Sequence, residues 1–534
     1  MKLLVCVRRV VDFDVKVRVK SDGPGVDAVA KLPKALVDKE QPGLVILGKQ
    51  AIASRRSSTD DQSSEVDMAI AQISKDDAES GLTESQKLAR YALGLRYEDI
   101  PNDVLDIARG HFLDALGIAL ASSTFDFGAA VLEAGRELGT GGQARAVGSA
   151  TPLPPASAAL VNGTLAHGLD FDDTHIGAIY HASAPALAAS LAAGEAASSS
   201  GRDVLVAYVI AMEVGCRLAG AAPGEFHKRG LHPTAMCGLF AAAVAAARLN
   251  DSDETALVSA LGLCGSQSGG ILEIGDSWLK RLHPGWAAHA GLVAESLGRK
   301  GFKGPSTVLE GVHGFFASHL GQVPSNERLP SHKLGERWHI LGLAFKPYPC
   351  CHFIHAFVDA ALALRDEIQL DQIERIECPL SGPLHHLVAE PRERRIRPTT
   401  IYEALFSVPY DVAVALVHGK VDLSTFYDSP LDDPKVLDIA SRTHCIQDPD
   451  SDYPNHYPGE VRITLKDGSV RKRREPTSRG TPERRVSRDD ISTKFMTNAT
   501  RAIGQREAER VATAVWNMEG LGNIKQLVSL CSKN

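Results

Sequence analysis

The chain has 534 residues, of which 44% are hydrophobic and 23% are charged, and its formal net charge is −7. This length exceeds what one hydrophobic core usually serves, so we expect two or three domains. The negative charge excludes bulk attraction to nucleic acid or to an anionic membrane surface. Nine cysteines without a CxxC pair indicate reduced thiols, and neither a signal peptide nor a membrane-spanning run is evident, so we expect a cytoplasmic protein.

Residues 1–52 contain two strand candidates, one near the amino terminus and one at 44–48. Residues 2–12 (KLLVCVRRVVD) and 34–52 (KALV, then GLVILGKQAI) resemble the β subunit of electron transfer flavoprotein. The two pieces lie closer together than in that family, and the nucleotide-binding remainder after Ile52 is missing. We therefore expect a short α/β-like fragment without nucleotide-binding activity. The alternative is a segment that docks to a flavoprotein and takes part in electron transfer.

The rest of the chain divides by composition and periodicity. Residues 53–81 are polar and predict a linker, because they offer little apolar surface to bury. Residues 82–339 predict an all-helical domain, since apolar residues recur at steps of three or four. Its expected helices after the first one, near 102–120, cover residues 155–168, 184–197, 204–219, 234–247, 255–263 and 287–297.

Residues 340–489 mix helix and strand signals and predict a smaller α+β domain. A strand is expected at 373–380, and a hairpin is expected around Lys466-Asp467-Gly468. Helices are expected at 354–364, 401–418 and 434–442. Residues 490–534 are helical again, and we expect them to return to the first helical domain. The predicted fold class is therefore mainly α.

One short stretch gathers reactive groups inside an apolar region. It runs from His167 through Asp170, Asp172, Asp173 and Thr174 to His175, and His181 follows. Charged groups at the edge of a core need partners or a function. An EF-hand is excluded because His175 and His181 stand where that loop requires Gly and Glu. No HExxH, paired-cysteine zinc spacing or GxSxG occurs either, so we expect no metal and no serine hydrolase.

Four further segments carry chemically useful side chains. They are Arg229 to Thr234, a His-Pro turn at a helix start; Trp278 to Gly285, a cationic turn before a helix; Phe345 to His355; and the pair His385-His386. Cations near helix starts suit a bound carboxylate. A cysteine nucleophile at Cys350 or Cys351 is an alternative, although buried structural thiols are commoner.

In their order and in their residues these segments resemble the MmgE/PrpD family, which includes 2-methylcitrate dehydratase and cis-aconitate decarboxylase. The motifs that carry the resemblance are HGLDFDDT from His167, LHPT from Leu231, KRLHPGWAA from Lys280, GP with LEG from Gly304 and Leu309, KPYPCCH from Lys346 and FSVPY from Phe406. Together they span about 450 residues of this chain, counted from residue 82 to the carboxyl end.

The resemblance implies a large helical domain, a smaller α+β lid domain, a homodimer, and a site between the two domains without metal or organic cofactor. Carried over by motif, the catalytic residues are Asp170, Thr174, His181 and His232, and the substrate-binding residues are Lys280, Lys346, Cys351, His352 and His385. Cys351 stands where the decarboxylase branch has a histidine, and His385 falls near a position where that branch has a tyrosine.

These parts suit the elimination of water from a small hydroxy-polycarboxylate. Such a reaction needs a base at the carbon next to a carboxylate, an acid for the leaving hydroxyl, and cations for the carboxylates. His181 and His232 are candidates for acid and base, Lys280 and Lys346 for the cations, and Thr174 for a hydrogen bond to a carboxylate. Asp170 either orients an imidazole or acts as the base. We therefore predict a 2-methylcitrate dehydratase-like lyase, with decarboxylation or epimerisation as alternatives.

Overall fold

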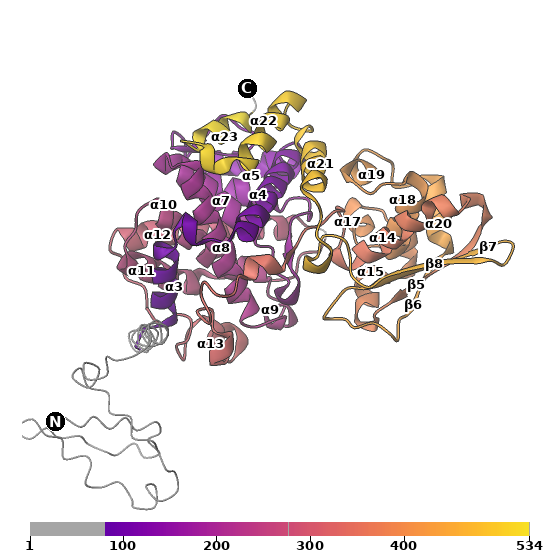
Figure 1. The fold of residues 1–534 in the computed structure, drawn as a ribbon, viewed down its shortest axis with the longest axis horizontal. Helices are drawn as coiled ribbons and strands as arrows, with labels where there is room; N and C mark the ends of the chain where they lie inside the picture. The colour runs from indigo at the N-terminus through magenta and orange to yellow at the C-terminus, as the bar shows by residue number, and fades with distance from the viewer. Residues whose placement is uncertain (1–80, 276, 533–534) are drawn as a thin grey trace, which may run out of the picture. The chain divides into compact units, whose positions relative to one another are not determined.

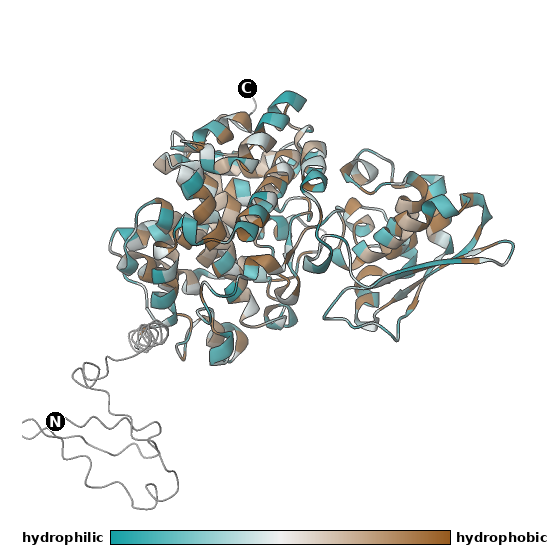
Figure 2. Cartoon of the chain, viewed as in Figure 1, coloured by the Kyte–Doolittle hydropathy of each residue, from teal (hydrophilic) through white to brown (hydrophobic). Residues whose placement is uncertain are grey.

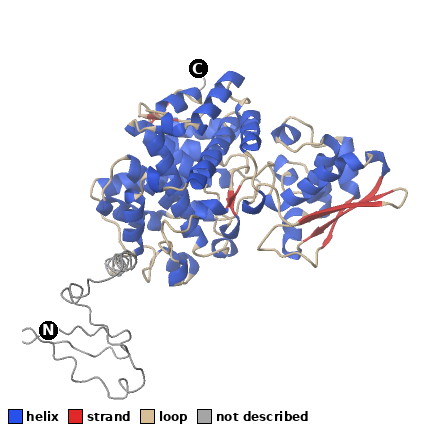
Figure 3. Ribbon diagram, in the orientation of Figure 1, coloured by secondary structure: helices blue, strands red, loops and turns tan. Residues whose placement is uncertain are grey.

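The computed structural model describes residues 81–275 and 277–532. The flavoprotein-like fragment at 1–52 and nearly all of the linker lie outside the described residues. Residues 82–534 form one compact unit that is mostly helical, with a small sheet near one end (Figure 1 and Figure 3). The expected mainly α fold is confirmed.

Helices from both ends of this unit share one hydrophobic core. The amino-terminal helices are α3 (Glu84–Gly94), α4 (Asn102–Ser122), α5 (Asp126–Glu137), α6 (Pro155–Ala166), α7 (Ser183–Ala197), α8 (Gly201–Gly220), α9 (Glu225–Lys228), α10 (Pro233–Leu249), α11 (Glu254–Gln267), α12 (Leu279–Arg299) and α13 (Phe315–Leu320). The carboxyl-terminal helices α21 (Arg488–Ala499), α22 (Gln505–Trp516) and α23 (Lys525–Leu530) pack into the same core. Figure 2 shows apolar and polar residues on different sides of many helices, as expected where one side faces a core.

Small residues let the helices of this core approach closely. A Cβ added to Gly163 of α6 would lie 2.7 Å from the Cα of Gly285 in α12, closer than real Cβ contacts occur. The two helices therefore cross backbone against backbone, and only glycine fits at this crossing. The many alanine and glycine residues of the sequence thus allow close packing between helices.

Helix α12 corrects one sequence-based prediction. Residues 278–285 were expected to form a cationic turn before a helix at 287, and a proline in a helix interior removes a backbone hydrogen bond. Instead α12 begins at Leu279 and continues through Pro284. The contact of Gly285 with α6 holds the two helices together at this point, so packing outweighs the hydrogen bond that proline cannot donate. Lys280 therefore lies in the first turn of a helix rather than in a loop.

The second core belongs to an α+β region between residues 348 and 465. Its four-stranded sheet has the order β6-β5-β7-β8, with β5 and β6 parallel and the other pairs antiparallel. The strands are β5 (Ile373–Leu380), β6 (Thr443–Gln447), β7 (Gly459–Leu465) and β8 (Val470–Glu475). The helices are α14 (His355–Leu364), α15 (His385–Val388), α16 (Arg392–Ile396), α17 (Ile401–Ala404), α18 (Val408–His418), α19 (Leu423–Tyr427) and α20 (Pro434–Arg442).

The helix predicted at 401–418 is wrong in one respect, because it is broken into α17 and α18. Ser407 caps α18 by accepting a hydrogen bond from the backbone N–H of Tyr410, and Pro409 occupies the first turn. Proline is well placed in a first turn but not in a helix interior, so the chain restarts a helix here. Two more strand pairs are short: β1 (Ala144–Arg145) with β2 (Pro152–Leu153), and β3 (Thr174–His175) with β4 (Leu343–Ala344).

Among the described residues, no single helix combines the length and apolar composition needed to cross a membrane. Only the pair α4 and α5 meets that test when its two helices are taken together, and they are bent by 93°. Most side chains of α4 are buried within the protein.

Candidate active site

The segment after helix α6 pairs with a strand that is distant in the sequence. Asp170 has a φ of 51°, in the left-handed region that aspartate tolerates better than most residues. Four residues later, Thr174 in β3 pairs with Ala344 in β4. Because Lys346 follows Ala344 by two residues, this short pairing brings Lys346 to Asp170.

Asp170 lies between two lysines from different parts of the chain. Its Oδ2 is 2.7 Å from Lys280 Nζ, and its Oδ1 is 3.0 Å from Lys346 Nζ. Lys346 Nζ also donates a hydrogen bond to the Asp170 carbonyl oxygen at 2.9 Å. Burial raises the pKa of Asp170, but the two ammonium groups outweigh burial and hold this pKa well below its usual range. The carboxylate is therefore ionised and fixes two cations at one point.

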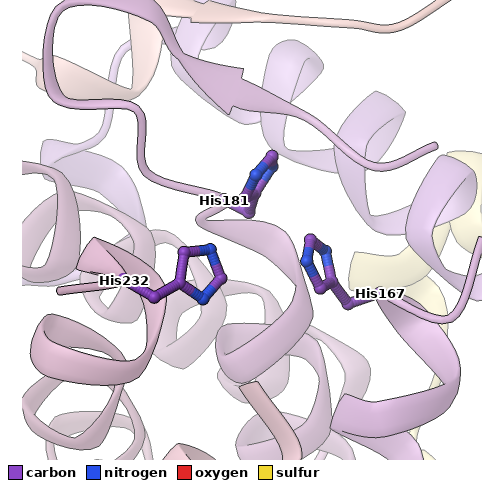
Figure 4. A group of neighbouring side chains, drawn as sticks. All are labelled: His167, His181 and His232. Atoms are coloured by element: carbon purple, nitrogen blue, oxygen red, sulfur yellow. The ribbon is translucent and has the colours of Figure 1, made fainter. Parts of the chain in front are cut away.

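Three buried imidazoles gather near this group (Figure 4). The ring centroid of His181 is 4.6 Å from that of His167 and 5.9 Å from that of His232. The Asp172 carboxylate holds His167, with both oxygens within 2.9 Å of its Nδ1. His167 Nε2 and His232 Nε2 are buried without a hydrogen-bond partner among the residues that the structure describes.

His181 and His232 are neutral at pH 7. Burial is the main cause that lowers the pKa of each imidazole well below 6.5, and Lys280 adds to the effect. His181 Nδ1 lies 2.7 Å from the carbonyl oxygen of Asp173, which accepts its hydrogen bond. The other ring nitrogen of His181 therefore carries a lone pair. A neutral imidazole with a free lone pair is suited to remove a proton.

Asp172 and Asp173 stabilise the loop through contacts outside the cavity. Burial raises the pKa of Asp172, but His167 and His181 reverse this and lower it to about 2. Burial and the neighbouring Asp172 raise the pKa of Asp173 to about 7. Asp173 accepts hydrogen bonds from the backbone N–H of Ser183 at 3.1 Å and from its hydroxyl at 2.7 Å. Neither aspartate lines the cavity described next.

A cavity of about 360 Å³ joins the ion pair and the imidazoles, which is a size typical of small-molecule sites. Eight of the nine residues predicted for the site line it: Asp170, Thr174, His181, His232, Lys280, Lys346, Cys351 and His352. The ninth, His385, does not line it, because its Nε2 pairs with the carbonyl oxygen of Leu380 at 3.2 Å. Leu387, two residues further along α15, lines the cavity instead.

The two thiols are not prepared for nucleophilic attack. Burial raises the pKa of Cys351 to about 12 and that of Cys350 well above its usual value. A cysteine nucleophile reacts as the thiolate, which neither residue forms near neutral pH. Burial also lowers the pKa of His352 to about 3, so this imidazole is neutral.

Sequence reasoning missed Lys494, which lies in helix α21 more than 300 residues after the loop it supports. Its Nζ donates hydrogen bonds to the carbonyl oxygens of Phe171 and Lys346, both at 2.9 Å. It also lies 2.7 Å from Oδ1 of the buried Asp114. Nothing near Lys494 in the sequence marks this role, because its partners come from distant segments. The returning carboxyl-terminal helices thus fix the backbone on both sides of the site.

Sequence reasoning also missed the apolar lining of the cavity. Phe353, Leu387, Tyr402, Phe406 and Tyr457 all contribute to it. Only Phe353, directly after KPYPCCH, and Phe406, which opens FSVPY, adjoin or begin a quoted motif. Apolar residues have no spacing that separates a cavity wall from a core, so this part of the site emerges only in three dimensions.

Among the described residues, two groups of side chains have the spacing to hold a metal ion: the imidazole cluster, and His167 and His181 together with Asp170 and Asp172. Nitrogen atoms of His167, His181 and His232 lie within 4.8 Å of one another. However, the positive charge of Lys280 adds to burial in lowering the pKa of both His181 and His232, and Asp170 of the second group is already paired with Lys280 and Lys346. A potential that opposes a proton opposes a divalent cation more strongly. The residues therefore fit a metal poorly while the lysines stay charged.

Comparisons with known proteins agree with this arrangement. The MmgE/PrpD N-terminal domain matches residues 86–327, and the MmgE/PrpD C-terminal domain matches residues 348–519. The chain is 30% identical over 396 residues to cis-aconitate decarboxylase of Mus musculus, covering 71% of this chain and 78% of that protein. It is 28% identical over 471 residues to the cis-aconitate decarboxylase-like protein oryM of Aspergillus oryzae, covering 84% and 96%. The cis-aconitate decarboxylase of Aspergillus terreus is 27% identical over 485 residues, with 86% and 97% covered.

The chain belongs to the MmgE/PrpD family, and the resemblance drawn from its motifs is confirmed. It is a lyase of that family.

Proposed function

We propose that the cavity is the active site of a cofactor-independent lyase that acts on a small polycarboxylate, and that the reaction is elimination of water from a 2-methylcitrate-like acid. The observation that carries this proposal is that two neutral imidazoles, His181 and His232, line the same cavity as Lys280 and Lys346. Bases and cations that share one cavity suit chemistry at the carbon next to a carboxylate.

The reaction divides into two proton transfers. One imidazole takes the proton from the carbon beside a bound carboxylate, and the electron pair moves into an enolate-like carboxylate. Lys280 and Lys346 stabilise the added negative charge, and such charge-assisted contacts are worth about 1.5–3 kcal/mol each. The abstracted proton goes to the leaving hydroxyl, either directly from the imidazolium just formed or relayed through the second imidazole, as the C–O bond breaks, so water and a carbon–carbon double bond result. Thr174 orients a carboxylate, and Asp170 keeps both lysines charged and in place.

Decarboxylation is the second candidate, and the relatives named cis-aconitate decarboxylase favour it. In that reaction a C–C bond breaks, carbon dioxide leaves, and the electron pair enters the same lysine-stabilised enolate. A proton then returns to carbon. Cys351 stands where the decarboxylase branch has a histidine, which is a reason to keep water elimination first. Epimerisation would use the same carbanion-like state without loss of either group.

A substrate screen by NMR tests both candidates. Purified protein, stripped of metal with a chelator, is incubated with hydroxy-polycarboxylates and with unsaturated polycarboxylates. We expect loss of the signals of the hydroxy acid and new signals of an unsaturated acid, with unchanged activity after chelation. Release of carbon dioxide from an unsaturated acid would favour decarboxylation instead. Activity that disappears on chelation and returns with zinc or iron would contradict the cofactor-free mechanism.

A further inference from the structure

The two halves of the cavity differ in charge. All of its charged side chains, Asp170, Lys280 and Lys346, come from residues 170–346. Among the described residues of the α+β region, those that line the cavity carry no charge at neutral pH. They include Phe353, Leu387 and Phe406, and the imidazole of His352, whose pKa burial lowers to about 3. The described α+β region therefore forms a wall that adds no charged side chain to the cavity lining, and a cation of that region, Arg395, acts on Cys351 and Tyr402 from outside that lining.

Contacts within the protein hold the side chains of this wall in place. The ring centroids of Phe353 and Tyr457 are 4.7 Å apart, and those of Tyr402 and Phe406 are 4.8 Å apart. The Tyr457 hydroxyl donates a hydrogen bond to the carbonyl oxygen of Ile176 at 3.3 Å, which ties the wall to the helical domain. Aromatic pairs at these distances are mutually stabilising, so the rings keep their positions.

Apolar residues of the helical domain extend the wall. Leu272 and Ile274, from the loop between α11 and α12, line the cavity, and so does Ile179. Ile179 has a φ of 53°. For a β-branched residue this left-handed conformation is strained, and such strain is found where function requires a particular side chain at a particular place. The backbone at Ile179 is thus strained, and this conformation places an apolar side chain in the cavity lining.

We propose that the substrate carries its carboxylates at one end and an apolar substituent of several carbons, an alkyl chain or a ring, at the other. This inference rests on the proposed function, in which the carboxylates bind at Lys280 and Lys346. A further carboxylate turned toward the wall would lose its water without gaining a cation, which is unfavourable. Methylene groups in the same place would be removed from water and stabilised.

A homologous series of acids tests the substrate class. The acids share one carboxylate pattern and carry hydrogen, methyl, propyl or pentyl on the same carbon. We expect kcat/KM to rise about fourfold for each added methylene until the cavity is filled. Equal or faster turnover of the unsubstituted acid would overturn the inference.

A binding series separates this inference from the proposed reaction. Alkylsuccinates have the carboxylates and the chain but no group to eliminate, and their affinity is measured by calorimetry. Affinity that rises with chain length, without turnover of any acid in the first series, would support the apolar end and contradict the proposed reaction. Affinity that is independent of chain length, with turnover of an unsubstituted acid, would overturn the apolar end and leave the reaction standing.

A positive charge placed on the wall should reduce the preference for acids that carry a long apolar substituent. Leu387→Lys adds a cation within the cavity, whereas His386→Lys adds one on the exposed side of the same helix, α15. We expect Leu387→Lys to lower kcat/KM for the pentyl acid at least tenfold relative to the unsubstituted acid, and His386→Lys to leave that ratio unchanged. Circular dichroism checks that both variants are folded. An unchanged ratio in folded Leu387→Lys would contradict the inference.

Discussion

At the scale of single residues, the site depends on one carboxylate shared by two lysines. Lys346 is buried and donates to both the carbonyl oxygen and the side chain of Asp170, and Lys280 contacts its second carboxylate oxygen. Two ammonium groups this close would repel each other without a shared anion. Asp170 is therefore a fixed counter-ion that holds both cations at one place in the cavity lining.

Asp170→Asn removes the charge and keeps the shape. Asparagine also tolerates the left-handed backbone found at this position, so we expect the variant to fold. Loss of the counter-ion should lower kcat/KM at least 100-fold, because the lysines lose charge or position. Asp251→Asn is a matched control, since Asp251 is exposed and has a φ of 50°. Activity within threefold of the unsubstituted protein in Asp170→Asn would contradict this role.

The pH dependence of turnover follows from the imidazoles. Burial lowers the pKa of His181 and His232 in the folded protein, so both lose their proton below pH 6.5 as pH rises. The active, neutral form is then fully populated at pH 7, and kcat/KM falls only on acidification well below pH 6.5. A profile of kcat/KM from pH 4.5 to 8.5 measures this acid limb. A limb centred at or above pH 6.5 would exclude these imidazoles as the base.

At the scale of elements, the site is assembled by contacts between segments that are far apart in sequence. The β3–β4 pair brings Lys346 to Asp170, and the first turn of α12 supplies Lys280. Helix α21 adds Lys494, which holds the backbone of both strand-adjacent segments. The carboxyl-terminal helices are therefore part of the active-site support and not an accessory.

Lys494→Met tests that support. The substitution leaves Asp114 buried without its ion-pair partner, which typically costs about 3–5 kcal/mol of unfolding free energy. We expect lower thermal stability and a loss of kcat. Adding Asp114→Asn should restore much of the stability, because position 114 then carries no unpaired buried charge. It should not restore kcat, because the hydrogen bonds to Phe171 and Lys346 stay absent. Full recovery of kcat in the double variant would show that Lys494 acts only through stability.

At the scale of the whole molecule, an exposed apolar stripe lies on helix α12. Trp278 is 51% exposed, Leu282 36% and Trp286 49%, at intervals of four residues. Stripes of this kind are commonly covered by a partner. We propose that a second copy of the chain covers this one, in line with the homodimer that the family resemblance implies.

Light scattering on a size-exclusion column checks this assembly. We expect a dimer of the 57.1 kDa chain and a monomer for Trp286→Glu. Leu138→Glu is the control, because Leu138 is 58% exposed but stands at the end of α5, in a different helix. A monomer at micromolar concentration without any substitution would contradict the proposal.

Removal of the residues before Leu82 tests whether the amino-terminal fragment contributes to activity. Among the described residues, those that line the cavity all lie after Leu82, and residues 82–534 form a compact unit. We therefore expect a chain that begins at Leu82 to keep its kcat/KM within twofold. Flavin absorbance in the purified full-length protein would instead favour the electron-transfer alternative, and loss of activity on removal would assign the fragment a role in the lyase.

Local patterns in the sequence predicted much of the fold, because helix periodicity and turn residues act over a few positions. The strand at Ile373–Leu380 and the helices α14 and α20 fall where they were expected. Two of the differences between prediction and structure lie at prolines. Pro284 is tolerated inside α12, where Gly285 packs against α6, whereas Pro409 starts a new helix. The same residue type gave opposite outcomes because packing differs at the two places.

For the site, the sequence alone determined which polar groups take part and which family they belong to, since those groups stand in short motifs with a fixed order. Only the tertiary structure decided how they meet. Asp170 shared by Lys280 and Lys346 and the support from Lys494 depend on contacts across more than 100 residues. The uncharged wall joins Phe353, Leu387 and Phe406, which lie 19 to 53 residues apart. Such contacts leave no local pattern, because any apolar or charged residue at a suitable position in the fold can make them.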